Sequence, residues 1–112
     1  MNHYYNSKDL GRFAEVGKFA PALMEKFFTY YNSTVGQDGA LSKREKALIA
    51  LAVATAKQCP YCIDAFTTTC LETGSNPEQM TEAIHVAAAM EAGMTLVHGV
   101  QMQNNLKEKG VM

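Results

Sequence analysis

Two segments of the chain are apolar on nearly every side of a helix, and they limit how the chain can fold. The first runs from Ala47 to Ala56, and the second runs from Ala83 to Met90 with His85 as its polar exception. A helix without a polar face has to be buried all round. With 112 residues, the chain supports one domain with a modest core. We therefore expect a homo-oligomer in which neighbouring subunits bury these helices.

The predicted fold class is all-α with about six helices, because β-branched runs and hairpin dipeptides are missing. A loose helical pattern, interrupted by glycines, covers residues 6–20. A firmer helix begins at Pro21 and ends at Gly36. The apolar face of this helix is formed by Met24, Phe28, Tyr31 and Val35.

The second half of the chain carries clear helix boundaries. A capping box spans Ser42 to Glu45 and begins the first apolar helix. Asn76 and Pro77 are suited to cap and begin the second apolar helix. We expect Gly93 to end this helix, and a last helix to run from Met94 to about Lys107.

Two cysteines, Cys59 and Cys62, are one helical turn apart and directly follow the first apolar segment. A helix that begins at Pro60 places Cys59 at its N-terminal end, because proline suits the first helical position. Unpaired N–H groups and the positive end of the helix dipole favour a thiolate there. A thiolate attacks disulfides and peroxides, so the pair favours redox chemistry. We expect this helix to end at Gly74.

Other roles for the cysteines stay open at this point. A Cys-x-x-Cys pair is half of a zinc site when two further ligands are present. Cys70, His85 and His98 are available, although they do not form a second closely spaced pair. Cysteines also pack as small hydrophobic residues, and Cys70, in the middle of its helix, suits that role best.

Composition and charge argue against several classes of protein. The formal net charge is −1 and no basic run is present, so we expect no nucleic-acid partner. The run from Ala47 to Ala56 has about half the length of a membrane-spanning helix. Met1 to Tyr5 lack the apolar region of a signal peptide, and an odd cysteine count argues against a secreted disulfide framework. We therefore expect a cytoplasmic protein with reduced thiols and no membrane partner.

The stretch from Leu41 to Phe66 resembles the AhpD-like alkylhydroperoxidase and carboxymuconolactone decarboxylase-like family. The resemblance rests on Leu41–Lys46, Ala50–Ala54 and Cys59–Ile63, and it continues weakly through Gly74 and Glu82–Ala89. It implies an all-helical, AhpD-like fold in which trimers and hexamers are common. We expect a single domain over residues 1–112, with its cysteine-motif core at about residues 41–92.

The activity implied by the resemblance is that of a thiol-dependent antioxidant oxidoreductase that reduces peroxides or exchanges disulfides without a cofactor. Its partners would be a peroxide or disulfide substrate and a thiol reductant, either a protein or a small dithiol. The alternative is a non-catalytic module that binds arsenic(III) or zinc through its thiols. A narrower likeness is to peroxidase-like proteins associated with arsenosugar biosynthesis, and it rests on Tyr4–Tyr5, Gln58–Ala65 and Leu96–Met102.

Two positions depart from the peroxidase pattern of the family. The family's relay histidine falls at Phe66, four residues after Cys62, and its relay glutamate falls at Ala47, twelve residues before Cys59. Those groups pass the proton that activates the thiol, so the resemblance extends to the cysteines but not to the relay. The decarboxylase branch of the family lacks the cysteine pair, which argues against decarboxylation here.

The candidate catalytic residues are Cys59, Cys62 and His85. Thioredoxin-like chemistry makes Cys59 the attacking thiol, whereas the family resemblance makes Cys62 the thiol that meets peroxide. Both schemes end in a disulfide between the two cysteines. His85 is either a proton relay that replaces the missing groups or a hydrogen-bonded core histidine.

Overall fold

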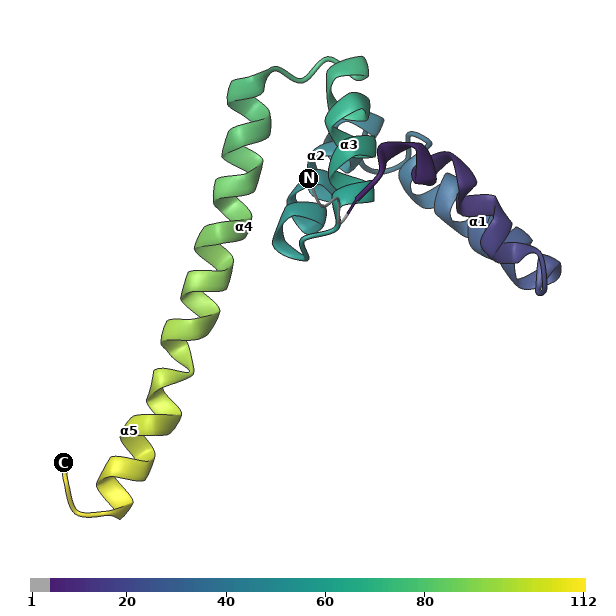
Figure 1. Ribbon diagram of the computed structural model, residues 1–112. Coiled ribbons are helices and arrows are strands. Elements are labelled where there is room, and N and C mark those ends of the chain that lie inside the picture. Colours follow the sequence, from purple (N-terminus) through teal and green to yellow (C-terminus); the bar gives the residue numbers. More distant parts are fainter. Residues whose placement is uncertain (1–4) are drawn as a thin grey trace.

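The computed structural model describes residues 5–112, and over that range all regular structure is helical. A 3-10 helix, η1 (Ser7–Gly17), comes first, and five α-helices follow it (Figure 1). These are α1 (Pro21–Val35), α2 (Lys43–Ala56), α3 (Pro60–Glu72), α4 (Pro77–Val97) and α5 (Gly99–Glu108). The predicted all-α fold class is therefore confirmed.

Local signals in the sequence set most of the helix boundaries. Ser42 forms the predicted capping box with Glu45 at the start of α2. Asn76 forms a second capping box with Gln79 at the start of α4. At the end of α3 the chain turns at Gly74, whose φ of +93° is a conformation that glycine adopts at low cost.

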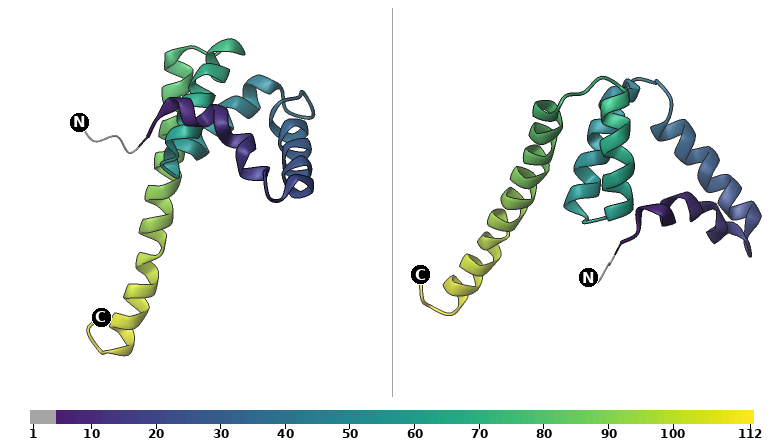
Figure 2. Two further views of the ribbon diagram at one scale, coloured as in Figure 1. Left: turned by 45° about the vertical axis from the view of Figure 1, so that its right-hand side comes forward. Right: turned by 45° about the horizontal axis from the view of Figure 1, so that its top comes forward.

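The centre of the fold is a hairpin of α2 and α3, which lie side by side (Figures 1 and 2). Ala47 and Leu51 of α2 pack in one buried cluster with Phe66 and Cys70 of α3. The other side of α2 stays open, because Ile49 is 52% exposed and Val53 is 56% exposed. The prediction that neighbouring subunits complete the burial of this helix stays a prediction.

The N-terminal elements η1 and α1 form a second pair beside the hairpin (Figure 2). Aromatic rings join them, with Phe13 of η1 against Phe27 and Phe28 of α1. Gly17 is buried and leaves room for Met24, because a Cβ at Gly17 would lie 2.6 Å from that side chain. The predicted apolar face of α1 is confirmed, since its half-buried residues are Met24, Phe28, Tyr31 and Val35.

The helix α4 packs against α2 near its beginning and then extends away from the hairpin (Figure 1). The predicted end of this helix at Gly93 is wrong, because the helix continues to Val97. One glycine within a helix costs only about 1 kcal/mol, which neighbouring residues offset. The change to α5 comes at His98 instead, whose Nδ1 lies 2.6 Å from the Met94 carbonyl oxygen. A side chain bonded to the preceding turn competes with the helix's own hydrogen bonds there.

We call α4 and α5 together the arm. The arm, Pro77–Glu108, is long and apolar enough to cross a membrane by length and composition, and none of its apolar window is buried. The predicted break at Gly93 would have left no segment of this length.

The dimensions of the chain reflect this extended arm. Its radius of gyration is 19.2 Å, whereas a compact domain of this length has a radius of about 13 Å. Its accessible surface is 8727 Å², compared with roughly 6,100 Å² for a compact monomer of the same mass. Apolar residues of the arm contribute to this excess, as Leu96 is 77% exposed and Val97 is 62% exposed.

Candidate functional site

Two successive backbone hydrogen bonds in the turn between α2 and α3 hold Cys59 in place. The Gln58 N–H donates to the Thr55 carbonyl over 3.2 Å, and the Cys59 N–H donates to the Ala54 carbonyl over 3.0 Å. This pair of bonds is a Schellman motif, which requires a left-handed residue at its centre. Gln58 takes that place with a φ of 56°. The end of α2 therefore fixes the backbone of Cys59.

The same residue begins the next helix, because Cys59 is the N-cap of α3. Its sulfur accepts a hydrogen bond from the Cys62 N–H over 3.4 Å, and Pro60 occupies the first helical position. The two sulfurs lie 2.9 Å apart and are not bonded to each other. The predicted positions of Cys59 and Pro60 are confirmed by this geometry.

The pKa values of the two thiols are shifted in opposite directions. The pKa of Cys59 is lowered, first by its hydrogen bond with the Cys62 side chain and then by the Cys62 N–H. The same side-chain hydrogen bond, together with burial, raises the pKa of Cys62 to about 11. When one proton is shared between the two sulfurs, it therefore stays on Cys62. Cys59 is then the thiolate, and only a thiolate is a strong nucleophile.

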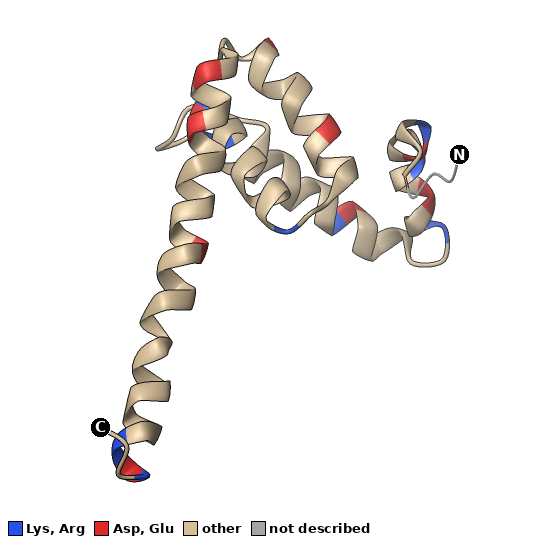
Figure 3. Cartoon of the chain, turned by 60° about the vertical axis from the view of Figure 1, so that its left-hand side comes forward, with Lys and Arg blue, Asp and Glu red and all other residues tan. Residues whose placement is uncertain are grey.

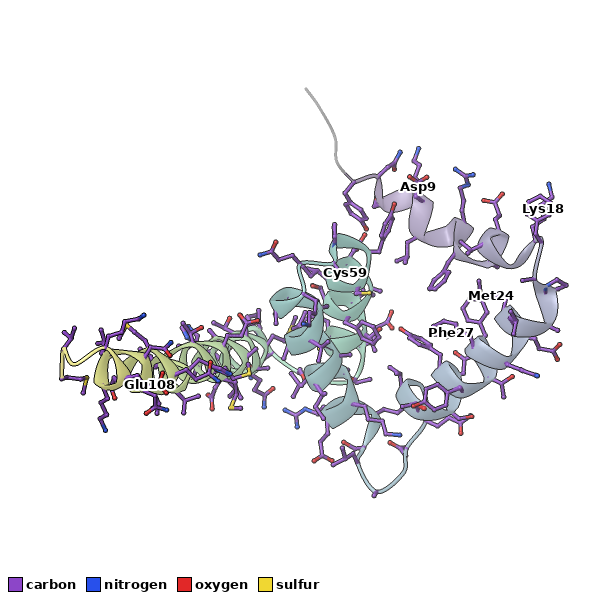
Figure 4. The ribbon with its side chains drawn as sticks, turned by 90° about the horizontal axis from the view of Figure 1, so that it is seen from below. Asp9, Lys18, Met24, Phe27, Cys59 and Glu108 are labelled. Carbon is purple, nitrogen blue, oxygen red and sulfur yellow. The ribbon has the colours of Figure 1, made fainter. Side chains whose placement is uncertain are left out.

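A cavity of about 520 Å³ opens beside both cysteines. Its volume lies within the range of pockets that hold small organic ligands. The walls come from α1, α2 and α3 and are largely apolar, with Val35, Ile49, Val53 and Phe66 among the lining residues. Tyr31 and Thr34 of α1 and the two lysines Lys46 and Lys57 are its polar lining residues. In Figure 4, Cys59 lies on the side of the hairpin that faces α1.

The N-terminal segment contacts the first turn of α3. The Tyr5 hydroxyl donates to the Asp64 carboxylate over 2.7 Å, and the Tyr5 ring packs edge-on against Tyr61 at 4.8 Å between centroids. Loss of hydration, followed by the bond to Asp64, raises the pKa of Tyr5 to about 12. No local pattern in the chain signals this contact, because Tyr5 lies 59 positions before Asp64.

The two positions of the family relay are both part of the buried cluster. Ala47 is 1% exposed and Phe66 is 7% exposed, and both pack with Leu51 and Cys70. Neither side chain can donate or accept a proton. The place of a relay between α2 and α3 is therefore filled by apolar packing.

The structure does not bring His85 into the cavity beside the cysteines. His85 is exposed on α4 and lines a separate hollow with Glu78, Thr81 and Glu82. Its catalytic role and the alternative of a core histidine buried by neighbouring subunits both stay predictions. Cys70 is fully buried, as its predicted packing role requires. Within residues 5–112, no group of three His, Cys, Asp or Glu side chains is placed to hold a metal ion.

Comparison with known proteins now identifies the family. The family model described as "Carboxymuconolactone decarboxylase family" matches residues 21–103. The chain belongs to this family. Its AhpD-like assignment is confirmed, whereas the arsenosugar-associated subgroup stays a prediction, and Tyr4 of that likeness lies outside the described residues.

Two relatives cover most of the chain. A protein of Paracoccus denitrificans described as "Uncharacterized protein 4 in cox locus" is 44% identical over 79 residues, which are 70% of this chain and 71% of the relative. The apo crystal structure of a carboxymuconolactone decarboxylase family protein from Legionella pneumophila is also similar. It is 33% identical, with a TM-score of 0.68 over 91% of each chain. The family and its helical fold are thus established, and the family is compatible with a redox role.

Proposed function

We propose that this protein is a thiol-dependent oxidoreductase that exchanges its Cys59–Cys62 dithiol with disulfide substrates. Peroxide reduction is a second and slower reaction of the same pair. The observation that carries the proposal is the approach of the two sulfurs to 2.9 Å at the start of α3, with a lowered pKa at Cys59 and a raised pKa at Cys62.

The difference in acidity assigns the roles of the two cysteines. The Cys59 thiolate attacks one sulfur of the substrate disulfide, and the other substrate sulfur leaves as a thiolate. Cys62 then loses its proton and attacks the Cys59 sulfur, which releases the second substrate thiolate. The dithiol gives up two electrons, and the substrate disulfide gains them. A thiol reductant, either a protein or a small dithiol, returns the pair to the dithiol state.

Peroxide reduction lacks the help that the family relay would supply. General acid–base assistance is typically worth ~10²–10⁴-fold in rate, and Ala47 and Phe66 supply none. His85 would take part only where another chain brings it to the cavity. A His85→Ala variant tests this role: loss of a fast peroxide reaction would make His85 the relay, whereas an unchanged slow reaction would leave it without one.

Mass spectrometry under native conditions tests the proposed function. Mild oxidation should remove two hydrogen atoms from the chain, and peptide mapping should place the new link between Cys59 and Cys62 while Cys70 stays a free thiol. The protein should also catalyse steady-state reduction of a disulfide substrate when a dithiol reductant is supplied. A dominant link to Cys70 would contradict the proposal. A metal or metalloid retained on the reduced pair without turnover would favour the binding module.

We also propose that the arm is covered by further copies of the same chain. The accessible surface exceeds that of a compact monomer by roughly 2,600 Å², which is in the range of stable subunit interfaces. From Ala83 to Leu106, Glu91 is the one Asp, Glu, Lys or Arg residue, and in the sequence it lies about midway between the ends of the arm. Figure 3 shows that most of the arm between its two ends is free of charged residues. A carboxylate at the centre of a membrane-spanning helix costs about 3 kcal/mol, so a protein partner is favoured over a membrane. Family likeness favours a trimer or a hexamer.

A further inference from the structure

The cavity beside the cysteines is lined by a tyrosine that the reaction above does not use. Tyr31 of α1 lines this cavity together with Cys59 and Cys62. It also packs against the buried cluster of α2 and α3, and its ring lies 5.5 Å from that of Phe27 between centroids. Contacts on both sides therefore hold the ring. Within residues 5–112, its hydroxyl makes no hydrogen bond, so its proton is available to a bound molecule.

The other polar residues of the cavity are less suited to donate a proton. The Thr34 hydroxyl is a very weak acid. The Lys46 ammonium already donates to the Gln37 carbonyl oxygen over 2.7 Å. Lys57 is an exposed residue at the end of α2, where water competes for its protons. Tyr31 is half-buried and lines the same cavity as the thiols.

We propose that Tyr31 is the proton donor of the dithiol–disulfide exchange, and this inference rests on the proposed function. The Cys59 thiolate bonds to one sulfur of the substrate, the substrate S–S bond breaks, and the leaving thiolate takes the Tyr31 proton. Cys62 then gives its proton to the Tyr31 phenolate. The resulting Cys62 thiolate bonds to the Cys59 sulfur and releases the second substrate thiolate, which takes a proton from water. Two thiols leave, and the enzyme holds one disulfide.

The acidities of the groups agree with this order of transfers. Burial raises the pKa of Tyr31, and the nearby charges of Cys62 and then Cys59 raise it further. The phenol therefore stays protonated at neutral pH and holds a proton when the leaving thiolate forms. Once Cys59 is bonded to the substrate, the hydrogen bond and the charge of Cys59 no longer raise the pKa of Cys62, so this thiol can pass its proton to the Tyr31 phenolate. Tyr31 thus links the first thiol transfer to activation of the second thiol.

Leaving-group dependence provides the test. An aliphatic disulfide, such as that of 2-mercaptoethanol, releases a basic thiolate that needs a proton. The aryl disulfide of thionitrobenzoate releases a stabilised thiolate that needs none. Tyr31→Phe should slow reduction of the aliphatic disulfide by ~10²-fold and leave reduction of the aryl disulfide nearly unchanged. Tyr30→Phe is the matched control, because Tyr30 is the adjacent residue of α1 and is 71% exposed.

The outcomes separate this inference from the proposed function. Equal loss on both disulfides would assign Tyr31 a structural role, and no loss on either would show that it donates no proton. Either result would overturn the inference while the proposed function stands. Wild-type protein that reduces neither disulfide would overturn both. The alkylation rate of Cys59 by iodoacetamide should be the same in Tyr31→Phe and wild type, which confirms that the thiol pair is intact.

Discussion

The α2–α3 hairpin and the α4–α5 arm, which Figure 2 shows as separate parts of the molecule, are built from similar apolar residues, yet they bury them to different extents. In the hairpin, Ala47, Leu51 and Ala54 of α2 are buried. In the arm, no residue of α4 or α5 is fully buried. Both regions begin with a capping box. Caps therefore explain where each helix begins, but they do not decide what covers it.

This difference in burial shows that the hairpin is formed by contacts between neighbouring elements, whereas the arm is left with an uncovered apolar surface. Within the hairpin, α2 obtains its buried partner from α3, the helix that directly follows it in sequence, so local turn chemistry is enough to bring the two cysteines together. Beyond its beginning, which packs against α2, the arm has no such partner within residues 5–112. In the proposed assembly, another subunit covers this apolar surface. The chemistry is thus encoded in the hairpin, and the proposed assembly is encoded in the neighbouring arm.

The largest effect is expected from changes confined to the hairpin. Cys59→Ser or Cys62→Ser should lower disulfide exchange by more than about 10³-fold, because the first removes the nucleophile and the second removes the resolving thiol. Cys70→Ala is the matched control and should keep turnover, since this buried thiol lies outside the cavity. Steady-state reduction of an aliphatic disulfide measures the effect. Full activity of either serine variant would contradict the role of the pair.

Changes confined to the arm should weaken the proposed subunit association and leave disulfide exchange intact. Leu96→Glu together with Val100→Glu places two carboxylates on its exposed apolar surface, where Leu96 is 77% and Val100 is 51% exposed. Burying unpaired charges should weaken subunit association by about 10²-fold or more. Val16→Glu on η1 is the control, because Val16 is similarly exposed at 72% but lies outside the arm. Light scattering at micromolar concentration should show smaller particles for the arm variant alone.

Assembly that is unchanged in the arm variant would exclude the arm as the interface. A wild-type protein that is monomeric at that concentration would remove the proposal of self-association itself. Disulfide exchange should persist in either case, since the arm contributes no residue to the cavity of its own chain.

Features that depend on neighbouring residues could be predicted from the sequence. The capping box at Ser42 and the start of α3 at Cys59 and Pro60 are examples, because their hydrogen bonds span only a few residues. The helix that passes through Gly93 could not be predicted, since a single glycine is compatible with either outcome. The contact of Tyr5 with Asp64 and the place of Tyr31 in the cavity depend on tertiary packing. No periodicity in the chain records such contacts.

The pH dependence of thiol reactivity can sharpen the assignment of roles within the hairpin. Cys59 should be alkylated by iodoacetamide at a lower pH than an ordinary thiol, because its pKa is lowered. Cys62, with a pKa raised to about 11, should stay largely unreactive up to mildly alkaline pH. In Cys59→Ser the main cause of the raised pKa is removed, so alkylation of Cys62 at pH ~8 should accelerate by at least about tenfold. Mass spectrometry of the alkylated peptides distinguishes the two sites.

A smaller effect of pH is expected on thermal stability. Its sign should follow from the raised pKa of Cys62. A thiol whose pKa is raised on folding stabilises the folded state below its unfolded pKa of about 8.5. That contribution is lost as the pH rises from there toward the folded pKa. Wild type should therefore lose stability over this alkaline window through Cys62, and Cys62→Ser should lose less. An identical decline in both proteins would contradict the assignment of the high pKa to Cys62.

The smallest effect is expected on the free energy of unfolding, from substitutions in the two turns that flank α3. Gly74 and Gln58 both have positive φ values, 93° and 56°, but one is the residue type that this conformation favours and the other is not. A Cβ at Gly74 meets no atom within 4 Å, so Gly74→Ala should lower the free energy of unfolding by about 1–2 kcal/mol through backbone strain alone. Gln58→Gly should raise it by roughly 0.5 kcal/mol, because relief of strain exceeds the added entropy of an unfolded glycine. Denaturant unfolding measures both changes. Should Gln58→Gly gain stability but slow disulfide exchange, then the left-handed glutamine restrains Cys59 for its chemistry; a gain without slower exchange would mean that the Schellman hydrogen bonds suffice.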